Sequence, residues 1–132
     1  MIGIDMVDKR RIATQWQTYG LQFAKRVLHP EELEQLQHKR DVIRFIASRW
    51  AAKEALGKAL GTGLRNPVLM PHIHLKKHPN GAPYFDYAPP LKALLEERQI
   101  AHIWISISDE KHYTIAYAHC SLEQSALRGG SL

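Results

Sequence analysis

One carboxylate and one amine in the middle of this sequence have a spacing suited to binding chemistry, because Glu54 is followed four residues later by Lys58. The segment around them, from Arg49 to Gly63, is rich in alanine and ends in glycines, so we expect a helix that stops at Gly61 or Gly63. In such a helix the two charges lie one turn apart on the same face. An ammonium and a carboxylate set among apolar side chains suggest a site for an anion together with its metal.

The helix that carries these charges is apolar on nearly every side. Ala47, Trp50 and Ala51 share the face of Glu54, and the opposite face carries four apolar residues: Phe45, Ala52, Leu56 and Ala59. A helix of this kind is usually buried, and the charges embedded in it then need partners. The alternative is an ordinary solvated ion pair worth roughly a few tenths of a kcal/mol. The small residues that crowd Glu54 argue against a solvated face.

Length and composition indicate one globular domain. The chain has 132 residues, and no apolar stretch approaches the roughly 20 residues of a membrane span. The N-terminus lacks a basic region followed by a long apolar run, so no secretory signal is expected. The single cysteine, Cys120, excludes an internal disulfide and fits a reducing compartment. We therefore expect a cytoplasmic protein in which Cys120 is a small core residue.

The charge balance predicts an anionic partner, because the net charge is +5 with neutral histidines. The sequence has no zinc finger, no aromatic RNA-binding motif and no uninterrupted basic block, which counts against a nucleic-acid-binding module. Its basic residues concentrate in the first half, so the anion-facing surface is expected on the N-terminal helices. His72 and His74 alternate along an expected strand, but two imidazoles alone do not make a zinc site. We expect them at an edge or facing solvent.

The order of the expected elements predicts an α+β fold, with a small antiparallel sheet packed on the long buried helix. A buried strand ends at Asp5, a helical stretch breaks near Gly20, and Asn80-Gly81 marks a tight turn. The expected helices cover residues 7–28, 30–39, 41–60 and 89–98, and the expected strands cover 1–5, 72–77, 84–87, 103–108 and 113–119. Residues 1–122 form the domain, and residues 123–132 are expected to be a flexible tail.

Three segments resemble the holo-[acyl-carrier-protein] synthases, which are 4'-phosphopantetheinyl transferases. They are Gly3-Ile4-Asp5-Met6-Val7, the run from Arg49 to Gly63, and Ser106-Ile107-Ser108-Asp109; the turn Asn80-Gly81-Ala82-Pro83-Tyr84 is also similar. Order and spacing agree up to about His119. The central segment is specific, whereas Ser-x-Ser alone is weak.

The resemblance implies transfer of 4'-phosphopantetheine from coenzyme A to a serine of apo acyl carrier protein, with release of adenosine 3',5'-bisphosphate, in fatty-acid biosynthesis. Such phosphoryl transfer suits Mg²⁺, which takes one or two carboxylates together with waters and substrate oxygens. Asp5 and Glu54 would be the metal ligands, and Lys58 would meet the pyrophosphate. By analogy Glu54, directly or through a metal-bound water, would take the serine proton.

The resemblance also implies two further groups of site residues. Coenzyme A would be bound by Arg49, Lys58, Gly61, Gly81, Pro83, Asp109 and His112. The acidic carrier protein would dock on a basic face formed by Arg10, Arg11, Phe23, Lys25 and Arg26, with Phe23 as an apolar anchor. Arg49 would meet another phosphate of the coenzyme or an adjoining subunit.

One residue departs from the family pattern. Many members have histidine where this sequence has Asp109, and a carboxylate repels a phosphate. Asp109 is therefore expected to accept from adenine or ribose, while Lys111 or His112 faces the phosphate. The resemblance further implies a homotrimer with its sites at subunit interfaces. The remaining alternatives are a basic nucleic-acid-binding module and a non-catalytic structural oligomer, which would not need Asp5 and Glu54.

Overall fold

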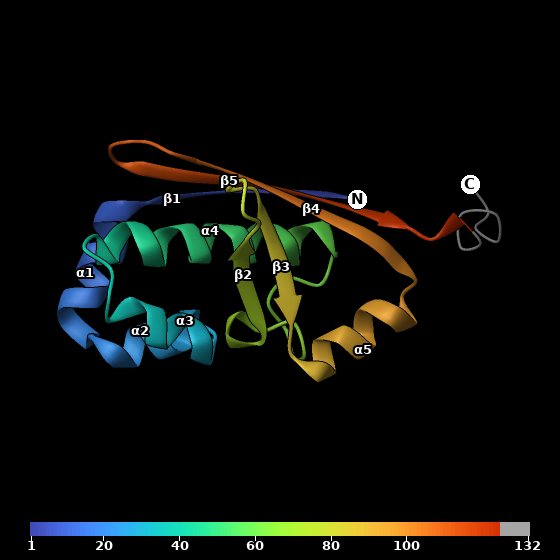
Figure 1. The fold of residues 1–132 in the computed structure, drawn as a ribbon, viewed down its shortest axis with the longest axis horizontal. Helices are drawn as coiled ribbons and strands as arrows, with labels where there is room; N and C mark the ends of the chain where they lie inside the picture. The colour runs from blue at the N-terminus through green and yellow to red at the C-terminus, as the bar shows by residue number, and fades with distance from the viewer. Residues whose placement is uncertain (125–132) are drawn as a thin grey trace.

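A long central helix organises the fold in the computed structural model, which describes residues 1–124. Helix α4 (Val42–Ala59) lies under a three-stranded antiparallel sheet with the strand order β1-β5-β4 (Figure 1). The strands are β1 (Ile2–Asp8), β4 (Ile100–Asp109) and β5 (Tyr113–Leu122). This is the α+β arrangement predicted from the sequence. The single domain over residues 1–122 stays a prediction, and residues 125–132 of the expected tail lie outside the described residues.

Three short helices cover one end of α4: α1 (Lys9–Tyr19), α2 (Leu21–Val27) and α3 (Pro30–Leu36). The break predicted near Gly20 is confirmed, since Gly20 has a φ of 54° and separates α1 from α2. Helix α3 begins at Pro30 as expected, because His29 forms a capping box with Glu32.

A two-stranded hairpin crosses α4, and its strand β3 packs against β4 of the large sheet (Figure 1). It consists of β2 (Ile73–Lys77) and β3 (Pro83–Tyr87), and the 3₁₀ turn η1 (Met70–His72) precedes it. Its turn is the one predicted at Asn80-Gly81, where Gly81 has a φ of 90°. Helix α5 (Pro89–Glu97) then leads into β4.

Helix α4 is buried on nearly every side, as predicted. Layers on both sides of it exclude water from Ala47, Ala51 and Ala55, which are fully buried. Cys120 is buried in the same core as expected, and burial raises the pKa of its thiol to about 11. Two other charges of the helix, Arg49 and Lys53, are buried and have partners there, whereas Glu54 is half-buried and Lys58 is exposed, so the burial predicted for the Glu54–Lys58 pair is only partly confirmed.

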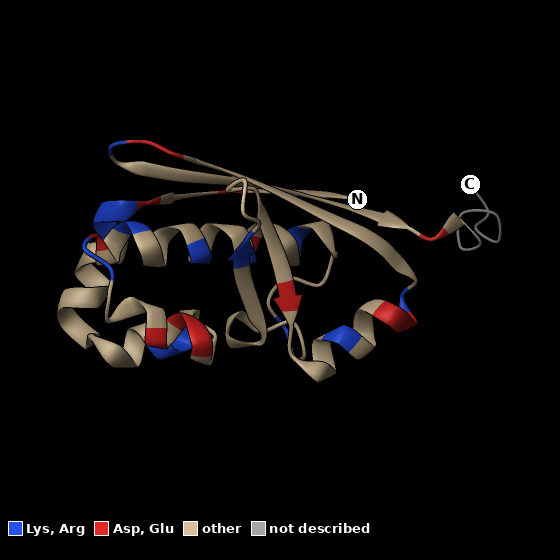
Figure 2. Ribbon diagram, viewed as in Figure 1, with Lys and Arg blue, Asp and Glu red and all other residues tan. Residues whose placement is uncertain are grey.

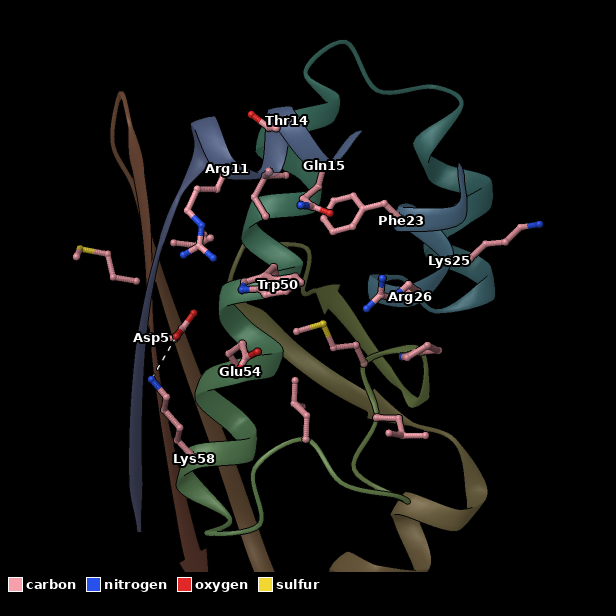
Figure 3. A pocket seen from close by; sticks show the side chains of 17 residues that line it. Asp5, Arg11, Thr14, Gln15, Phe23, Lys25, Arg26, Trp50, Glu54 and Lys58 are labelled. Atoms are coloured by element: carbon pink, nitrogen blue, oxygen red, sulfur yellow. Dashed lines mark hydrogen bonds and ion pairs between the residues drawn. The ribbon is translucent and has the colours of Figure 1, made fainter. Parts of the chain in front are cut away.

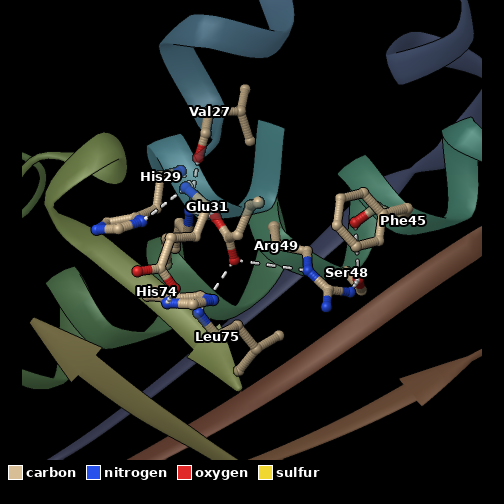
Figure 4. Close-up of polar contacts among 10 residues, drawn as sticks. Val27, His29, Glu31, Phe45, Ser48, Arg49, His74 and Leu75 are labelled. Carbon is tan, nitrogen blue, oxygen red and sulfur yellow. Dashed lines mark hydrogen bonds and ion pairs between the residues drawn. The ribbon is translucent and has the colours of Figure 1, made fainter. Parts of the chain in front are cut away.

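A buried carboxylate from α3 supplies those partners (Figure 4). Glu32 is fully buried, and it accepts hydrogen bonds from Lys53 Nζ at 2.5 Å and from the backbone N–H of Leu75 at 3.0 Å. Arg49 Nε lies 3.6 Å from the same carboxylate. Burial lowers the pKa of both Lys53 and Arg49, and the charge of Glu32 opposes that shift. Removing one member of such a group leaves an uncompensated buried charge, so the cluster fixes α3, α4 and β2 together.

Two local expectations are wrong. The first strand does not end at Asp5 and is not buried: β1 continues to Asp8 at the edge of the sheet, and Ile2, Ile4 and Met6 are each at least 60% exposed. His74 is neither solvent-facing nor exposed at an edge. It is buried and stacks on the ring of His29, with 4.8 Å between ring centroids. His72 lies in the turn before β2, so the two histidines do not share a strand face.

Candidate active site

Asp5 reaches helix α4 because β1 alternates its side chains between two faces. Gly3, Asp5 and Val7 point toward the helix, while Ile4 and its outward neighbours point away. The contact is close: a Cβ added at Gly3 would lie 2.1 Å from the carbonyl oxygen of Ala55. Glycine at this position therefore allows β1 to approach α4 at the level of the two charged side chains.

Glu54 and Lys58 meet Asp5 across this contact (Figure 3). Lys58 Nζ donates to the carbonyl oxygen of Ile4 at 3.0 Å and to Asp5 Oδ1 at 3.2 Å. Asp5 Oδ2 is buried and has no hydrogen-bond partner among the described residues. Two carboxylates that the sequence separates by 49 positions thus lie beside one another, with one lysine at their edge.

The electrostatics of this pair favour a cation. Burial raises the pKa of Asp5 despite the hydrogen bond from Lys58. Burial also raises the pKa of Glu54, and the nearby charge of Asp5 raises it further. Two carboxylates that are partly removed from water and repel each other are stabilised in their ionised form by a positive ion between them.

The pair opens into a cavity of about 1120 Å³ between α4, α1, α2 and the segment before β2 (Figure 3). Arg11, Lys25 and Arg26 line it together with the carboxylates; Arg11 and Arg26 turn inward, whereas Lys25 points away from the cavity. Trp50 forms part of the wall. The cavity therefore combines an acidic corner, a basic rim and an apolar wall.

Phe23 does not project from the docking face as expected. It is only 4% exposed, and its ring lies 6.2 Å from that of Trp50, so it belongs to the wall of the cavity. Arg10 lies outside this lining. Its guanidinium pairs with Asp8 at 2.8 Å and sits 5.8 Å from the ring of Tyr113.

A second cavity of about 1030 Å³ lies beyond the start of α4, between α3, α4 and the β2-β3 hairpin. Four residues expected to bind coenzyme A line it: Arg49, Gly81, Pro83 and Asp109. Five basic residues and three acidic residues contribute to its walls, so its charge is positive overall. The structure thus distributes the predicted site residues over two cavities.

Three residues predicted to bind coenzyme A do not line the second cavity. Gly61 ends helix α4 with a φ of 74°, and His112 is exposed on the β4-β5 turn, where its carbonyl oxygen accepts from the backbone N–H of Lys9. Neither lines the two cavities described above. Lys58 lines the first cavity only.

Sequence reasoning missed several residues of the second cavity, namely Arg44, His74, Lys76 and Lys77. The imidazole Nε2 of His74 is buried without a hydrogen-bond partner within residues 1–124. A basic pair directly before the Asn-Gly turn was the available signal for Lys76 and Lys77. Arg44 gave no such signal, because only folding brings it next to Asp109.

The first cavity could hold a metal ion through Asp5 and Glu54. Residues 1–124 contain no group of three or more His, Cys, Asp or Glu side chains arranged around one metal position. Two carboxylates are nevertheless what Mg²⁺ needs from a protein when waters and phosphate oxygens complete its shell. The partnerless Oδ2 of Asp5 fits such a ligand.

Comparisons with known proteins identify the family. A sequence model of the 4'-phosphopantetheinyl transferase superfamily, ACPS type, matches residues 1–118. The holo-[acyl-carrier-protein] synthase of Thiobacillus denitrificans is 43% identical over 125 residues, which are 95% of this chain and 94% of that protein. The chain belongs to the holo-[acyl-carrier-protein] synthases. The resemblance stated from the sequence is confirmed.

Solved structures of this synthase family have the same fold. The crystal structure of the synthase from Neisseria meningitidis has a TM-score of 0.89 and 38% identity, covering 91% of this chain and 96% of that one. The synthase from Helicobacter pylori in complex with coenzyme A has a TM-score of 0.80 and 30% identity, covering 92% and 100%.

Family membership decides between the predicted functions. Holo-[acyl-carrier-protein] synthases transfer 4'-phosphopantetheine from coenzyme A to apo acyl carrier protein, so the chain is a transferase of fatty-acid biosynthesis. The nucleic-acid-binding and purely structural alternatives are set aside. Within residues 1–124, no helix is both long and apolar enough to cross a membrane.

Proposed function

We propose that Asp5 and Glu54 hold a magnesium ion against the diphosphate of coenzyme A, and that Lys58 binds the same diphosphate. The observation that supports this assignment is the buried Oδ2 of Asp5, which lies beside Glu54 and has no hydrogen-bond partner within residues 1–124. Bound there, Mg²⁺ would neutralise charge on the diphosphate and lower the pKa of a coordinated water. The pocket supplies the two carboxylates, and Lys58, whose side chain is 52% exposed, supplies a positive charge beside Asp5.

Glu54 and Lys58 then have different roles in phosphoryl transfer. The carrier serine oxygen attacks the phosphorus that bears the pantetheine arm, and the bond from that phosphorus to adenosine 3',5'-bisphosphate breaks. Glu54 lies at the proposed metal position and accepts the serine proton directly or through a water. Lys58 stabilises the charge that develops on the leaving phosphate.

The basic rim of the first cavity is the proposed docking face for an acidic carrier protein. Arg11 and Arg26 turn toward the cavity, and Lys25 extends outward beside them. Lys and Arg also mark the start of α1, while acidic residues gather on α3 (Figure 2). Arg10 has a smaller part, because Asp8 and Tyr113 already engage it. Such a face steers an acidic partner and sets its orientation.

The two cavities are proposed to combine into one site in a homotrimer. The outward face of the large sheet carries a row of exposed apolar residues: Ile2, Ile4, Met6, Trp104 and Tyr117. A contiguous apolar face of this kind indicates a protein interface. A neighbouring subunit packed there would bring Arg49, Gly81, Pro83 and Asp109 of its second cavity toward the nucleotide. The free, buried thiol of Cys120 supports a location in the reducing cytoplasm.

The assignment is tested by incubating the protein with apo carrier protein, coenzyme A and Mg²⁺ and weighing the carrier by mass spectrometry. We expect Asp5→Asn and Glu54→Gln each to reduce the turnover at least about a hundredfold. Glu97→Gln is the matched control, because Glu97 is an exposed acid on α5 outside both cavities. Turnover within about threefold of wild type in both Asp5→Asn and Glu54→Gln would contradict the proposal.

A further inference from the structure

Two histidines join the start of α3 to strand β2. The rings of His29 and His74 are stacked, with 4.8 Å between their centroids and 9° between their planes (Figure 4). His29 directly precedes Pro30, the first residue of α3, and His74 is the second residue of β2. His74 is only 4% exposed, and His29 is half-buried. We call these two residues the histidine pair. Because histidine titrates close to neutral pH, this contact joins two elements through groups that acid can charge.

The cap of α3 needs His29 without a proton on Nδ1. This nitrogen lies 3.1 Å from the backbone nitrogen of Glu31 and accepts a hydrogen bond from its N–H. Both ring nitrogens of a protonated histidine are donors, so protonation of His29 removes the acceptor. The usual capping residues, serine, threonine, asparagine and aspartate, accept through an oxygen and keep this ability in mild acid. The cap of α3 is therefore one that acid can remove.

His74 favours its neutral form. Its Nδ1 lies 3.4 Å from Oε2 of Glu31, and its Nε2 is buried without a hydrogen-bond partner within residues 1–124. Burial lowers the pKa of His74, and so do the neighbouring His29 and Lys76, whereas Glu32 and Glu31 oppose the shift. Below the ordinary pKa of 6.5 the unfolded chain thus takes up a proton that the folded chain resists. The stability that comes from neutral His74 is complete above this pH and is lost as the pH falls.

The charged groups on the other elements packed around the pair are already paired or exposed. From α4, Arg49 and Lys53 both lie on Glu32 and offset its charge. From β3, Asp86 stands opposite His74 in the hairpin, but its side chain is exposed. Two charged imidazole rings stacked on each other repel. Each proton that the pair takes up therefore works against the contact between α3 and β2.

We propose that the histidine pair makes the attachment of α3 sensitive to pH: with both rings neutral it holds the start of α3 on β2, and protonation in mild acid releases the first turn of α3. Release affects the core, because Glu32 lies in that turn and its carboxylate binds Lys53 and the backbone N–H of Leu75. Glu31 and His74 also line the second cavity, so one wall of that cavity loosens in the same step. This inference goes beyond the proposed function and does not depend on the metal site.

Thermal unfolding of the full chain at about pH 7.5 and about pH 5.5 tests the proposal. The wild type is compared with the double variant of His29→Ser and His74→Phe, which caps α3 with a hydroxyl, keeps an aromatic ring at position 74 and does not titrate there. We expect Tm of the wild type to fall by about 4 °C more than Tm of the double variant between these pH values. The remaining histidines are the same in both proteins and cancel. His38→Gln is the control, because His38 is an exposed histidine just beyond the other end of α3, and this variant should follow the wild type. An equal fall of Tm in the wild type and the double variant would overturn the proposal.

A local measurement separates release of α3 from general destabilisation by acid. In proton–nitrogen correlation spectra of the wild type, the amide proton of Glu31 should move upfield as the pH falls over this range, because its acceptor is lost when His29 is protonated. The movement should be absent in His29→Ser, which also reports any contribution from the carboxylate of Glu31 itself. His29→Asn replaces the serine variant if that variant does not fold. An amide of Glu31 that responds equally in the wild type and in the variant would show that His29 does not control the cap.

The single variants test whether the two rings act together. If a proton on one ring opposes a proton on the other, His29→Ser and His74→Phe each remove the same repulsion. Their separate effects on the pH-dependent fall of Tm should then sum to more than the effect of the double variant. Additive effects would mean that the rings titrate independently and would overturn the role of the stack. None of these measurements uses turnover, so their failure would leave the proposed active site standing, and failure of the active-site variants would leave this inference standing.

Discussion

The acidic corner of the first cavity is the part of the molecule that we propose holds a cation. Asp5 and Glu54 are both partly buried and repel each other, and Lys58 pairs with Asp5 at 3.2 Å. A protein keeps such a pair for the ligand that relieves it, since raised pKa values of grouped carboxylates mark functional sites. The same reasoning separates this corner from Asp109, whose pKa is lowered by neighbours that already satisfy it.

Magnesium should therefore stabilise the folded protein through this corner. We expect millimolar Mg²⁺ to raise Tm of the wild type by about 2 °C or more, because a ligand that binds only the folded state stabilises it. Asp5→Asn and Glu54→Gln should lose this shift, and without metal both should be at least as stable as wild type, since each removes a repulsion. Differential scanning calorimetry with EDTA and with Mg²⁺ measures both effects. An equal Mg²⁺ shift in the variants would place the metal elsewhere.

The pKa of Asp8 is shifted in the opposite direction to the pKa values of Asp5 and Glu54, so the contribution of Asp8 to stability depends on pH. Side-chain and backbone hydrogen bonds from Arg10 lower the pKa of Asp8 to about 2, and its carboxylate caps helix α1. A lowered folded pKa means that this contribution to stability is complete above the unfolded pKa of 3.8 and is lost as the pH falls toward 2. The stability difference between wild type and Asp8→Ala should therefore shrink between about pH 4 and pH 2. Urea unfolding across this window measures it, and a difference independent of pH would contradict the assignment.

The sequence alone could assign residues to the candidate site only where they lie within one segment. Glu54 and Lys58 share a helical face, and the resemblance added Asp5 through a short motif. Arg44 and Lys76 could not be assigned, because their cavity forms from α3, α4 and β2, and no spacing in the chain encodes that meeting. Phe23 was misplaced for a related reason: an aromatic residue on a basic helix has the same sequence pattern whether it faces solvent or Trp50.

The elements followed the sequence closely where local chemistry defines their ends. Alanine content and Gly61 placed α4 within a residue or two, and Gly20 and Pro30 marked helix boundaries. The prediction that β1 is a buried strand was wrong, because an apolar run has the same sequence pattern in a buried strand and in an exposed edge strand. In the fold, alternation sends Ile4 outward and Asp5 inward, and the apolar run of β1 alone does not tell which of its faces is covered.

The approach of β1 to α4 depends on Gly3. A methyl group at this position would meet backbone atoms of Ala55 and Ala59 at 2.1 and 2.5 Å, so Gly3→Ala must push the strand away from the helix. We expect a loss of about 1–3 kcal/mol in unfolding free energy and a marked fall in turnover, since Asp5 moves with the strand. Chemical denaturation and the mass-spectrometric transfer assay measure the two effects.

Gly20→Ala is the comparison for that experiment. Gly20 has a positive φ of 54° but open space around its Cα, so alanine there adds backbone strain of about 1–2 kcal/mol without a clash. Its turnover per folded molecule should remain at the wild-type level. If Gly3→Ala kept full turnover as well, the close packing of β1 on α4 would not be what positions Asp5.

One chain has two cavities on different parts of its surface and a sheet face with exposed apolar residues. The first cavity holds the carboxylates, and the second holds Arg44, Arg49 and the turn at Gly81. Coenzyme A has a phosphate at the 3' position and a diphosphate at the 5' position of its ribose, and in the proposed function these groups meet different cavities. In the proposed homotrimer, assembly through the sheet face would supply the second surface from a neighbour, and oligomerisation would then be part of the chemistry and not only of stability.

Sharing of the site between subunits predicts complementation. Glu54→Gln lacks the first half-site, and a double variant with Arg44→Glu and Lys76→Glu lacks the second. Each alone should transfer little phosphopantetheine at limiting coenzyme A. Subunits that are unfolded together and refolded as a 1:1 mixture should recover about a quarter of wild-type turnover, because about one in four random interfaces joins two intact halves.

The refolded mixture distinguishes a site shared between two subunits from a site formed within one chain. If both cavities of one chain served the same coenzyme molecule, no mixed assembly would contain a complete site, and turnover would remain at the sum of the separate variants. Ile4→Glu on the intact background is the control, because a charge on the exposed apolar face should prevent assembly. Sedimentation should then report a monomer, and turnover should fall although both half-sites are unchanged. A fully active monomer would show that one chain completes the site alone.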